Sequence, residues 1–243
     1  MQGNHGSVFG WVVSRRTTIV LAVLLVLALF HAVILRFFAW PFQASSSSTP
    51  ADYFCMHGNE LGADGFQTYD ATAEWHGKTA GRKILLLLPH ASRIVEVGAV
   101  RSFEQTCLSE LRKRGVPSAD VWPIRADALD VWDEARALSE WLKEHPDATV
   151  RIGCNPFSSG RLRYVLSKVL GPVDAERVGL ATLPDPECRV ESWWRSRSGV
   201  KEFMYGWLEL IHAWAKGDNA HAEMPDAATF QHEIRAQIGE APR

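Results

Sequence analysis

The sequence predicts an α/β protein with a Rossmann-like, doubly wound and mainly parallel five-stranded sheet, preceded by one N-terminal transmembrane helix. Three observations support this prediction. One long apolar run lies near the N-terminus, five short apolar runs follow it, and amphipathic stretches separate the short runs. Strands that alternate with helices form parallel sheets, because each crossover helix returns the chain to the same end of the sheet.

The long apolar run covers residues 17–35 and reads TTIVLAVLLVLALFHAVIL, in which His31 is the one strongly polar residue. A helix of this length spans roughly 28 Å at about 1.5 Å per residue, which matches the hydrocarbon thickness of a bilayer. A cleaved signal peptide has a shorter apolar core, and a twin-arginine signal at 14–16 fits the residues after it poorly. The sequence therefore favours an uncleaved membrane anchor.

The charges that flank the apolar run predict its orientation. Arg15 and Arg16 precede the run and Arg36 alone follows it. The positive-inside rule therefore places the N-terminus in the cytoplasm and the rest of the chain on the other side of the membrane. An aromatic belt at the outer interface is expected from Phe37, Phe38 and Trp40.

The sequence divides the chain into five parts. A cytoplasmic N-terminus (1–16) precedes the anchor (17–40), and a serine-rich linker (41–50) that contains QASSSSTP is flexible by its composition. An α/β domain covers 51–215, and a polar tail (216–243) follows it.

The first half of the domain predicts two strands, each followed by a helix. A weak strand at 53–56 precedes a helix around 65–75. The run KILLLL at 83–88 is uninterrupted and ends at Pro89, which is typical of a strand that is buried on both faces. A helix then covers 103–114 with its apolar residues on one stripe, and the glycine that follows ends it.

The second half continues the alternation. Strands are expected at 121–124, 150–154 and 177–181. The helix after the first of these places four apolar residues on one face and stops at His145, and the helix after the second is capped by Ser158 or Ser159 and closed by Gly171. A last amphipathic helix, rich in aromatic residues, is expected at 200–215.

The net charge and the cysteine spacing argue against a nucleic-acid partner and against a metal site. The net charge is −2, and because the first 50 residues contribute three arginines and no acid, the rest of the chain carries −5. A mildly acidic domain argues against a nucleic-acid partner, since phosphate binding needs a clustered basic face. The four cysteines form no C-x-x-C pair, so we expect buried free thiols and no metal site. The sequence identifies no cofactor.

The carboxyl ends of the strands are where open parallel sheets bind ligands, so the residues that follow each strand are the candidate site. After strand one these are His57, Gly58 and Asn59, and after strand four they are Asn155, Ser158, Ser159 and Arg161. Strands two and three are followed by His90, Ser92, Arg93, Arg125, Asp127 and Asp130.

The loop after strand four points to an anion. Ser158 and Ser159 open a helix whose free N–H groups and positive dipole end attract negative charge, and Arg161 would add a bidentate contact. The alternative is a serine cap with a solvated arginine. Both interpretations fit the residues equally.

Glu104 and a Trp–Arg cluster are the remaining candidates. Glu104 fits a general base or a carboxylate that orients the ligand, or else an acid in a first helical turn that complements the helix dipole. Trp194 and Arg195, next to Trp193, could stack a sugar or base ring or lie at the membrane interface. The alternative for these tryptophans is packing of the last helix against the sheet.

Five stretches of the domain carry a resemblance to a known family. They are the opening strand ADYF, the segment EQTCLSELRKRGVP that starts at Glu104, the helix DEARALSEWL, the loop NPFSSGR and the stretch WWRSRSGVKEF. On these motifs, residues 51–215 resemble the YdcF/SanA/ElyC-like family, bacterial α/β domains that are often tethered to the inner membrane. The resemblance implies a single-pass protein of a bacterial inner membrane, with a periplasmic domain that acts in surface-polymer or permeability maintenance.

Three positions depart from the family pattern. The Gly-Gly turn after the first strand reads His57-Gly58-Asn59 here, Ser158 stands at the family's histidine, and the threonine of the third helix is replaced near Trp132. Two functions are therefore expected. The first is an envelope protein that binds an anionic small molecule or polymer precursor and hydrolyses it or transfers a group, and the second is a non-catalytic relative that binds or scaffolds.

Overall fold

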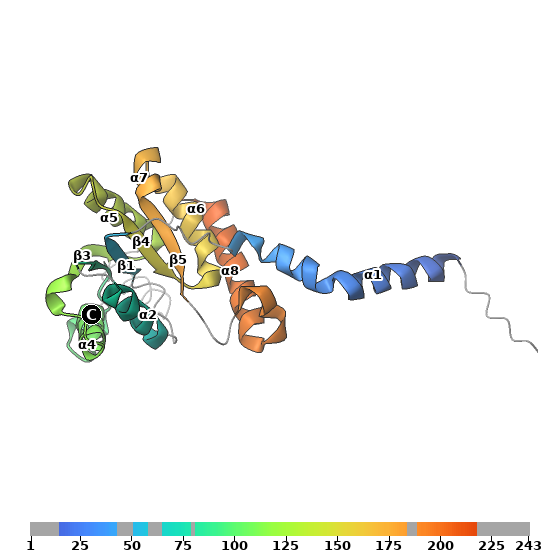
Figure 1. Ribbon diagram of the computed structural model, residues 1–243, viewed down its shortest axis with the longest axis horizontal. Helices are drawn as coiled ribbons and strands as arrows, with labels where there is room; N and C mark the ends of the chain where they lie inside the picture. Colours follow the sequence, from blue (N-terminus) through green and yellow to red (C-terminus); the bar gives the residue numbers. More distant parts are fainter. Residues whose placement is uncertain (1–14, 43–50, 58–64, 79–80, 184–188, 218–243) are drawn as a thin grey trace, which may run out of the picture.

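Five parallel strands form one sheet with the order β3-β2-β1-β4-β5 (Figure 1). The computed structural model describes residues 15–42, 51–57, 65–78, 81–183 and 189–217. The strands are β1 (Tyr53–His57), β2 (Lys83–Pro89), β3 (Val121–Ala128), β4 (Val150–Cys154) and β5 (Val178–Thr182). The chain leaves β1 towards β2 and β3 and then returns to the other side of β1 for β4 and β5. This order confirms the predicted α/β class with a Rossmann-like parallel sheet.

Helices cover both faces of the sheet. Helices α2 (Gly65–Gly77) and α4 (Phe103–Lys113) pack on the face that carries Phe54 and Ile84. On the opposite face, α5 (Val131–Glu144) and α6 (Ser159–Val169) pack against Cys55, Leu85 and Ile152. Successive strand residues point to opposite faces, so each buried strand supplies both halves of the core.

Strand β3 continues to Ala128, whereas the sequence predicted its end at Ile124. The reason is its position at the edge of the sheet, where side chains alternate between burial and solvent. An edge strand tolerates Pro123 and charged residues that a central strand excludes. Arg125 and Asp127 therefore lie within β3 and do not follow it.

Two short helices were not predicted, namely α3 (Arg93–Glu96) and α7 (Pro172–Arg177). Gly171 and Pro172 do close α6, as expected, but Pro172 also opens α7, because proline suits the first position of a helix. The predicted linker residues 43–50 and the tail after residue 217 lie outside the described residues.

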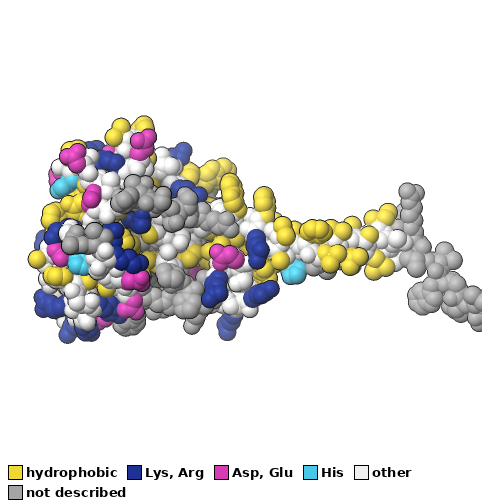
Figure 2. Space-filling model, in the orientation of Figure 1, with side chains coloured by type: hydrophobic (Ala, Val, Ile, Leu, Met, Phe, Trp, Pro, Cys, Tyr) yellow, Lys and Arg dark blue, Asp and Glu magenta, His cyan; other side chains and the backbone are white. Residues whose placement is uncertain are grey.

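Helix α1 (Arg15–Phe38) leaves the domain as a stalk (Figures 1 and 2). Every large apolar side chain described between Ile19 and Phe30 is more than half exposed. Within the described part of the chain, no single straight helix has the length and hydropathy to cross a membrane. The two halves of α1, Thr17–Val26 and Leu29–Phe38, meet at 59° and reach that length and hydropathy together.

The C-terminal end of α1 is packed into the domain. The turn η1 (Trp40–Phe42) lies against η4 (Pro156–Ser158), η5 (Val190–Arg195) and α8 (Arg197–Lys216). We call the buried residues there the aromatic cluster; its members are Ala39, Phe42, Phe157, Val190, Trp193 and Phe203. Phe42, which the sequence placed in the linker, is completely buried at its centre.

Two tryptophans hold the end of α1 by hydrogen bonds. The indole N–H of Trp193 donates to the carbonyl of Leu35, and that of Trp207 donates to the carbonyl of Phe38, each at 3.2 Å. The last four carbonyls of a helix have no partner within the helix, so these bonds satisfy groups that would otherwise need water. The orientation of α1 relative to the sheet therefore depends on the aromatic cluster.

Replacing Phe42 tests this packing. The ring contacts Phe157 and Trp207 edge to face, with centroids 5.5 Å apart in both pairs. We expect Phe42→Ala to lower the free energy of unfolding by about 3 kcal/mol, because it leaves a cavity in a dry cluster. Trp40→Ala, at a neighbouring exposed position, is the control and should change it by less than about 0.5 kcal/mol. Urea unfolding of the full chain in detergent micelles measures both, and equal effects would contradict the packing role of Phe42.

Candidate functional site

A buried histidine–glutamate pair lies at the carboxyl end of the central strand. His57 is the last residue of β1, and Glu134 lies in the first turn of α5. The Nδ1 atom of His57 is 3.0 Å from Oε2 of Glu134, and each side chain is 3% exposed. Burying a carboxylate costs several kcal/mol unless it is paired, so each of the two residues stabilises the other in this position.

The start of α5 fixes the position of Glu134. Asp130 caps the helix and accepts hydrogen bonds from the backbone N–H groups of Trp132 and Asp133, at 2.8 and 3.0 Å. The carboxylate of Asp133 in turn accepts from the N–H of Leu129. The positive end of the α5 dipole then also favours the negative charge of Glu134.

The pair is a contact between two buried side chains. One hydrogen bond joins Nδ1 of His57 and Oε2 of Glu134, and which atom donates depends on the tautomer of the ring and the protonation of the carboxyl group. The other ring nitrogen, Nε2, is buried as well. The contact therefore serves the structure of this edge.

Cys55, two residues before His57, does not share in this chemistry. Its side chain points to the same face of the sheet and is completely buried. Burial, together with the nearby charge of Glu134, raises the pKa of the Cys55 thiol far above its usual range. A nucleophilic cysteine needs a lowered pKa, so Cys55 stays protonated and inert. Cys107 and Cys154 are also buried free thiols, as predicted, whereas Cys188 lies outside the described residues.

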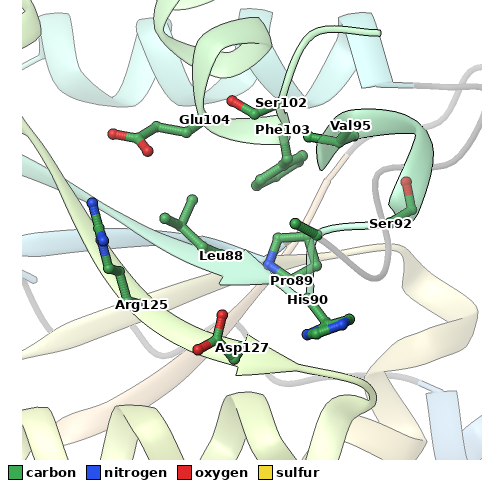
Figure 3. A pocket seen from close by; sticks show the side chains of 11 residues that line it. Leu88, Pro89, His90, Ser92, Val95, Ser102, Phe103, Glu104, Arg125 and Asp127 are labelled. Carbon is green, nitrogen blue, oxygen red and sulfur yellow. The ribbon is translucent and has the colours of Figure 1, made fainter. Parts of the chain in front are cut away.

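A pocket of about 350 Å³ opens at the carboxyl ends of β2 and β3, beside the start of α4 (Figure 3). His57 is in register with Leu87, whereas the pocket is lined by the following residue, Leu88, so the pair and the pocket lie at the same edge of the sheet on opposite faces. Apolar and polar residues line it together; they are Leu88, Pro89, His90, Ala91, Ser92, Val95, Ser102, Phe103, Glu104, Arg125 and Asp127.

Three charged side chains face the pocket from two elements. Figure 3 shows Glu104 on α4 and Arg125 and Asp127 on β3, with Leu88 between them and the Phe103 ring to one side, near Pro89. No hydrogen bond or ion pair joins any of these three side chains to another residue in the described parts of the chain. Their charges are therefore open to a ligand.

The backbone at Asp127 is strained. Its φ is +44°, in the left-handed region that non-glycine residues seldom occupy. The strain coincides with a bulge, because Leu88 pairs with Arg125 while the next residue, Pro89, pairs with Ala128. Bulges that re-aim a side chain occur often beside functional sites, and this one places Asp127 in the wall of the pocket.

Glu104, which the sequence suggests as a catalytic residue, lies in the first turn of α4 and lines the pocket. Ser102 begins α4 with a capping box, in which its side chain accepts from the N–H of Gln105. Glu104 is thus held in the first helical turn, half-buried in the pocket wall. This position fits a general base or an acceptor for ligand hydroxyls, and it also complements the dipole of α4.

The loop after β4 is arranged differently from the expected anion site. Asn155 caps η4 by accepting from the N–H of Phe157, and Ser158 occupies the cap position of α6 without a side-chain cap bond. The hydroxyl of Ser159 is completely buried and donates to the carbonyls of Phe42 and Pro156, at 2.7 and 2.6 Å. Residues 41–42 therefore cover the start of α6, and the hydroxyl serves packing.

The remaining predicted site residues lie on the α8 side of the domain. Arg161 forms an ion pair with Glu209 of α8, at 3.5 Å. Trp194 packs against the aromatic cluster and Arg195 is exposed. Gly58 and Asn59 lie outside the described residues. Of the predicted residues, the structure thus places His57 at the end of β1 and brings His90, Ser92, Glu104, Arg125 and Asp127 together in the pocket at the ends of β2 and β3.

Sequence reasoning gave too little weight to Glu134, Arg125 and Asp127. Glu134 lies within the stretch DEARALSEWL, but the sequence did not single it out as a site residue. Arg125 and Asp127 were named, but nothing in the sequence separated them from other charged loop residues. Asp127 gains its position from the bulge, which depends on the pairing with β2.

Neither a search of the described residues for metal ligands nor comparison with known proteins identifies a ligand for the site. Among the described residues, no group of three or more His, Cys, Asp or Glu side chains could hold a metal ion. Comparisons with family models, curated proteins and solved structures gave no match. The fold and its edge pocket define the chain as a Rossmann-like α/β protein.

A double-mutant cycle tests the histidine–glutamate pair. His57→Ala and Glu134→Ala should each lower the free energy of unfolding by about 3 kcal/mol, because each leaves a buried partner without its charge or its hydrogen bond. The double variant should cost less than the sum, with a coupling of about 1–2 kcal/mol. The exposed Glu74–Lys78 pair is the control, and its coupling should be much smaller. Additive effects at positions 57 and 134 would show that the pair is not energetically coupled.

Proposed function

We propose that the chain is a single-pass membrane protein of the bacterial envelope whose domain binds an anionic, hydroxyl-rich small molecule, such as a precursor of a surface polysaccharide. The observation that carries the proposal is the pocket in which Glu104, Arg125 and Asp127 face an open space of about 350 Å³. Small-molecule sites are usually concave, mostly apolar and provided with a few polar groups, and they begin at about this size.

The lining of the pocket supports this class of ligand. The guanidinium of Arg125 suits a phosphate or carboxylate, which it can bind through two parallel hydrogen bonds. The carboxylates of Glu104 and Asp127 accept hydrogen bonds from hydroxyl groups. The ring of Phe103 offers an apolar surface for the C–H face of a sugar.

Two further observations support the envelope role. The large apolar side chains of α1 are exposed along its length, which suits contact with lipid and not with water. The resemblance of residues 51–215 to the YdcF/SanA/ElyC-like family supports a place in the envelope, and the stretch DEARALSEWL, which carries part of that resemblance, includes Glu134 of the buried pair.

Hydrolysis or group transfer in the same pocket is the second candidate function. It is favoured by Glu104, whose carboxylate faces the open space from the first turn of α4. Glu104 could act as a general base. In an enzyme, Glu104→Gln would retain binding and lose turnover. If the chain only binds, the unaltered protein would bind the ligand without converting it chemically.

A thermal-shift screen with uridine diphosphate sugars and sugar phosphates tests ligand binding. A ligand at about 100 times its Kd stabilises a protein by about 2.7 kcal/mol, which raises the Tm of a domain of this size by about 5–10 °C. Arg125→Ala should abolish the shift. Arg93→Ala removes an equally exposed arginine that does not line the pocket, and it should preserve the shift. If both variants keep the shift, the ligand binds elsewhere.

Reporter fusions test the orientation. An alkaline phosphatase fused to the C-terminus should be active and a green fluorescent protein at the same place dark, because Arg15 and Arg16 retain the N-terminus in the cytoplasm. Replacing both arginines by alanine removes this bias and should lower the phosphatase activity. If instead the green fluorescent protein fusion fluoresces and the phosphatase fusion is inactive, the domain lies in the cytoplasm.

A further inference from the structure

Helix α8 has an exposed apolar face that no other described element covers. Val200, Met204, Leu208 and Ile211 follow one another at intervals of four, four and three residues, which places them on one side of a helix. Each is at least 40% exposed, and Trp214 beside them is 71% exposed. The opposite side of α8 is buried and carries Gly199, Phe203, Gly206 and Ala213.

The buried side of α8 is tightly fitted, so the exposed face has a fixed direction. A Cβ at Gly206 would come within 2.7 Å of the carbonyl oxygen of Phe157, and the ring of Phe203 stacks on Trp193 with centroids 3.6 Å apart. Helix α8 therefore cannot rotate to bury its apolar face against its own domain.

The same helix contacts the end of α1. Trp207, at the border between the two faces of α8, donates to the carbonyl of Phe38. Figure 1 shows α8 running across the base of α1, on the side of the domain from which α1 leaves. Phe37 and Trp40, at the end of α1, are also largely exposed. The end of α1 and α8 thus lie side by side, and both carry exposed apolar side chains.

Basic residues border this surface. Arg36, at the end of α1, donates from Nε to the carbonyl of Glu191 in η5, so α1 and η5 lie side by side. Arg195, Arg197 and Lys201 follow on η5 and α8, and all are exposed. Figure 2 shows Lys and Arg side chains gathered at the base of the stalk. Apolar side chains flanked by lysine and arginine are typical of helices that lie in a bilayer interface.

We propose that α8 lies on the surface of the bilayer that α1 crosses, with its apolar face among the lipid chains and Arg195, Arg197 and Lys201 on anionic headgroups. This inference rests on the proposed membrane anchor, and it holds for either orientation of the chain. Because α8 contacts the end of α1, it lies at the level where a membrane-spanning α1 would leave the bilayer, and its exposed apolar face is available to lipid there. The interface would then fix the domain at two places, α1 and α8.

Quenching by brominated lipids in nanodiscs tests the position of α8 in the full chain. A bimane label is attached, one position at a time, to Leu208→Cys on α8, Leu24→Cys on α1 and Glu140→Cys on the exposed side of α5, with Cys188→Ser in each variant. The other cysteines are buried and should not react. Brominated lipid should lower the fluorescence at positions 208 and 24 about twofold or more and leave position 140 unchanged.

The outcomes separate this inference from the proposed anchor. Quenching at position 24 without quenching at position 208 overturns the interfacial role of α8 and leaves the anchor intact. No quenching at position 24 overturns the anchor itself. A label at position 208 that is shielded from water but not quenched shows a second protein on this face, which also overturns the proposal.

The lipid charge provides a second measurement. Quenching at position 208 should be stronger in nanodiscs that contain phosphatidylglycerol than in nanodiscs of phosphatidylcholine alone. The combined variant Arg195→Ala/Arg197→Ala should remove that difference, whereas Arg163→Ala, an exposed arginine of α6, should retain it. Equal quenching in both lipids with the unaltered arginines would overturn the assignment of these residues to anionic headgroups.

Discussion

The carbonyl groups at the end of α1 impose the constraint on which the arrangement of this chain depends. A helix that ends inside a protein must find donors for its last carbonyls, and here the domain supplies the indole N–H groups of Trp193 and Trp207. Two tryptophans from separate elements can reach these atoms only if η5 and α8 are packed around Phe42. The aromatic cluster, the direction of α1 and the outward face of α8 are therefore consequences of one set of contacts.

A second constraint acts at the carboxyl edge of the sheet, where a carboxylate is buried between β1 and α5. Glu134 is tolerated there because it shares a hydrogen bond with His57 and because Asp130 fixes the helix terminus that faces it. The apolar core of that face, with Cys55, Leu85 and Leu138, surrounds the pair and strengthens its electrostatic attraction. The edge is therefore rigid at β1, whereas the strained bulge of β3 shapes the adjoining pocket.

The sequence predicted most of the fold but only part of the site, and particular residues show why. The run KILLLL identified β2 because a strand buried on both faces is continuously apolar, whereas the last part of β3 was missed because an edge strand carries turn-like residues such as Arg125 and Asp127. Arg125 and Asp127 could be named because the carboxyl-edge rule depends on topology alone, whereas Glu104 was named from its place in a first helical turn and from the family resemblance. The surroundings of Ser159 could not be predicted, since its partner Phe42 lies 117 residues away in sequence.

The positions of the pocket and the stalk together favour a water-soluble ligand over a lipid-linked one. The pocket opens at β2 and β3, whereas α8 packs on α6 at the β4–β5 side of the sheet. Parallel strands are spaced by about 4.8 Å, so the sheet alone separates the pocket from α8 by roughly 15 Å. Figure 1 accordingly shows α4, which borders the pocket, at the side of the domain away from α1. A headgroup tethered to the bilayer under α8 would have to cross the whole sheet, whereas a soluble sugar nucleotide or sugar phosphate reaches Arg125 directly from solvent.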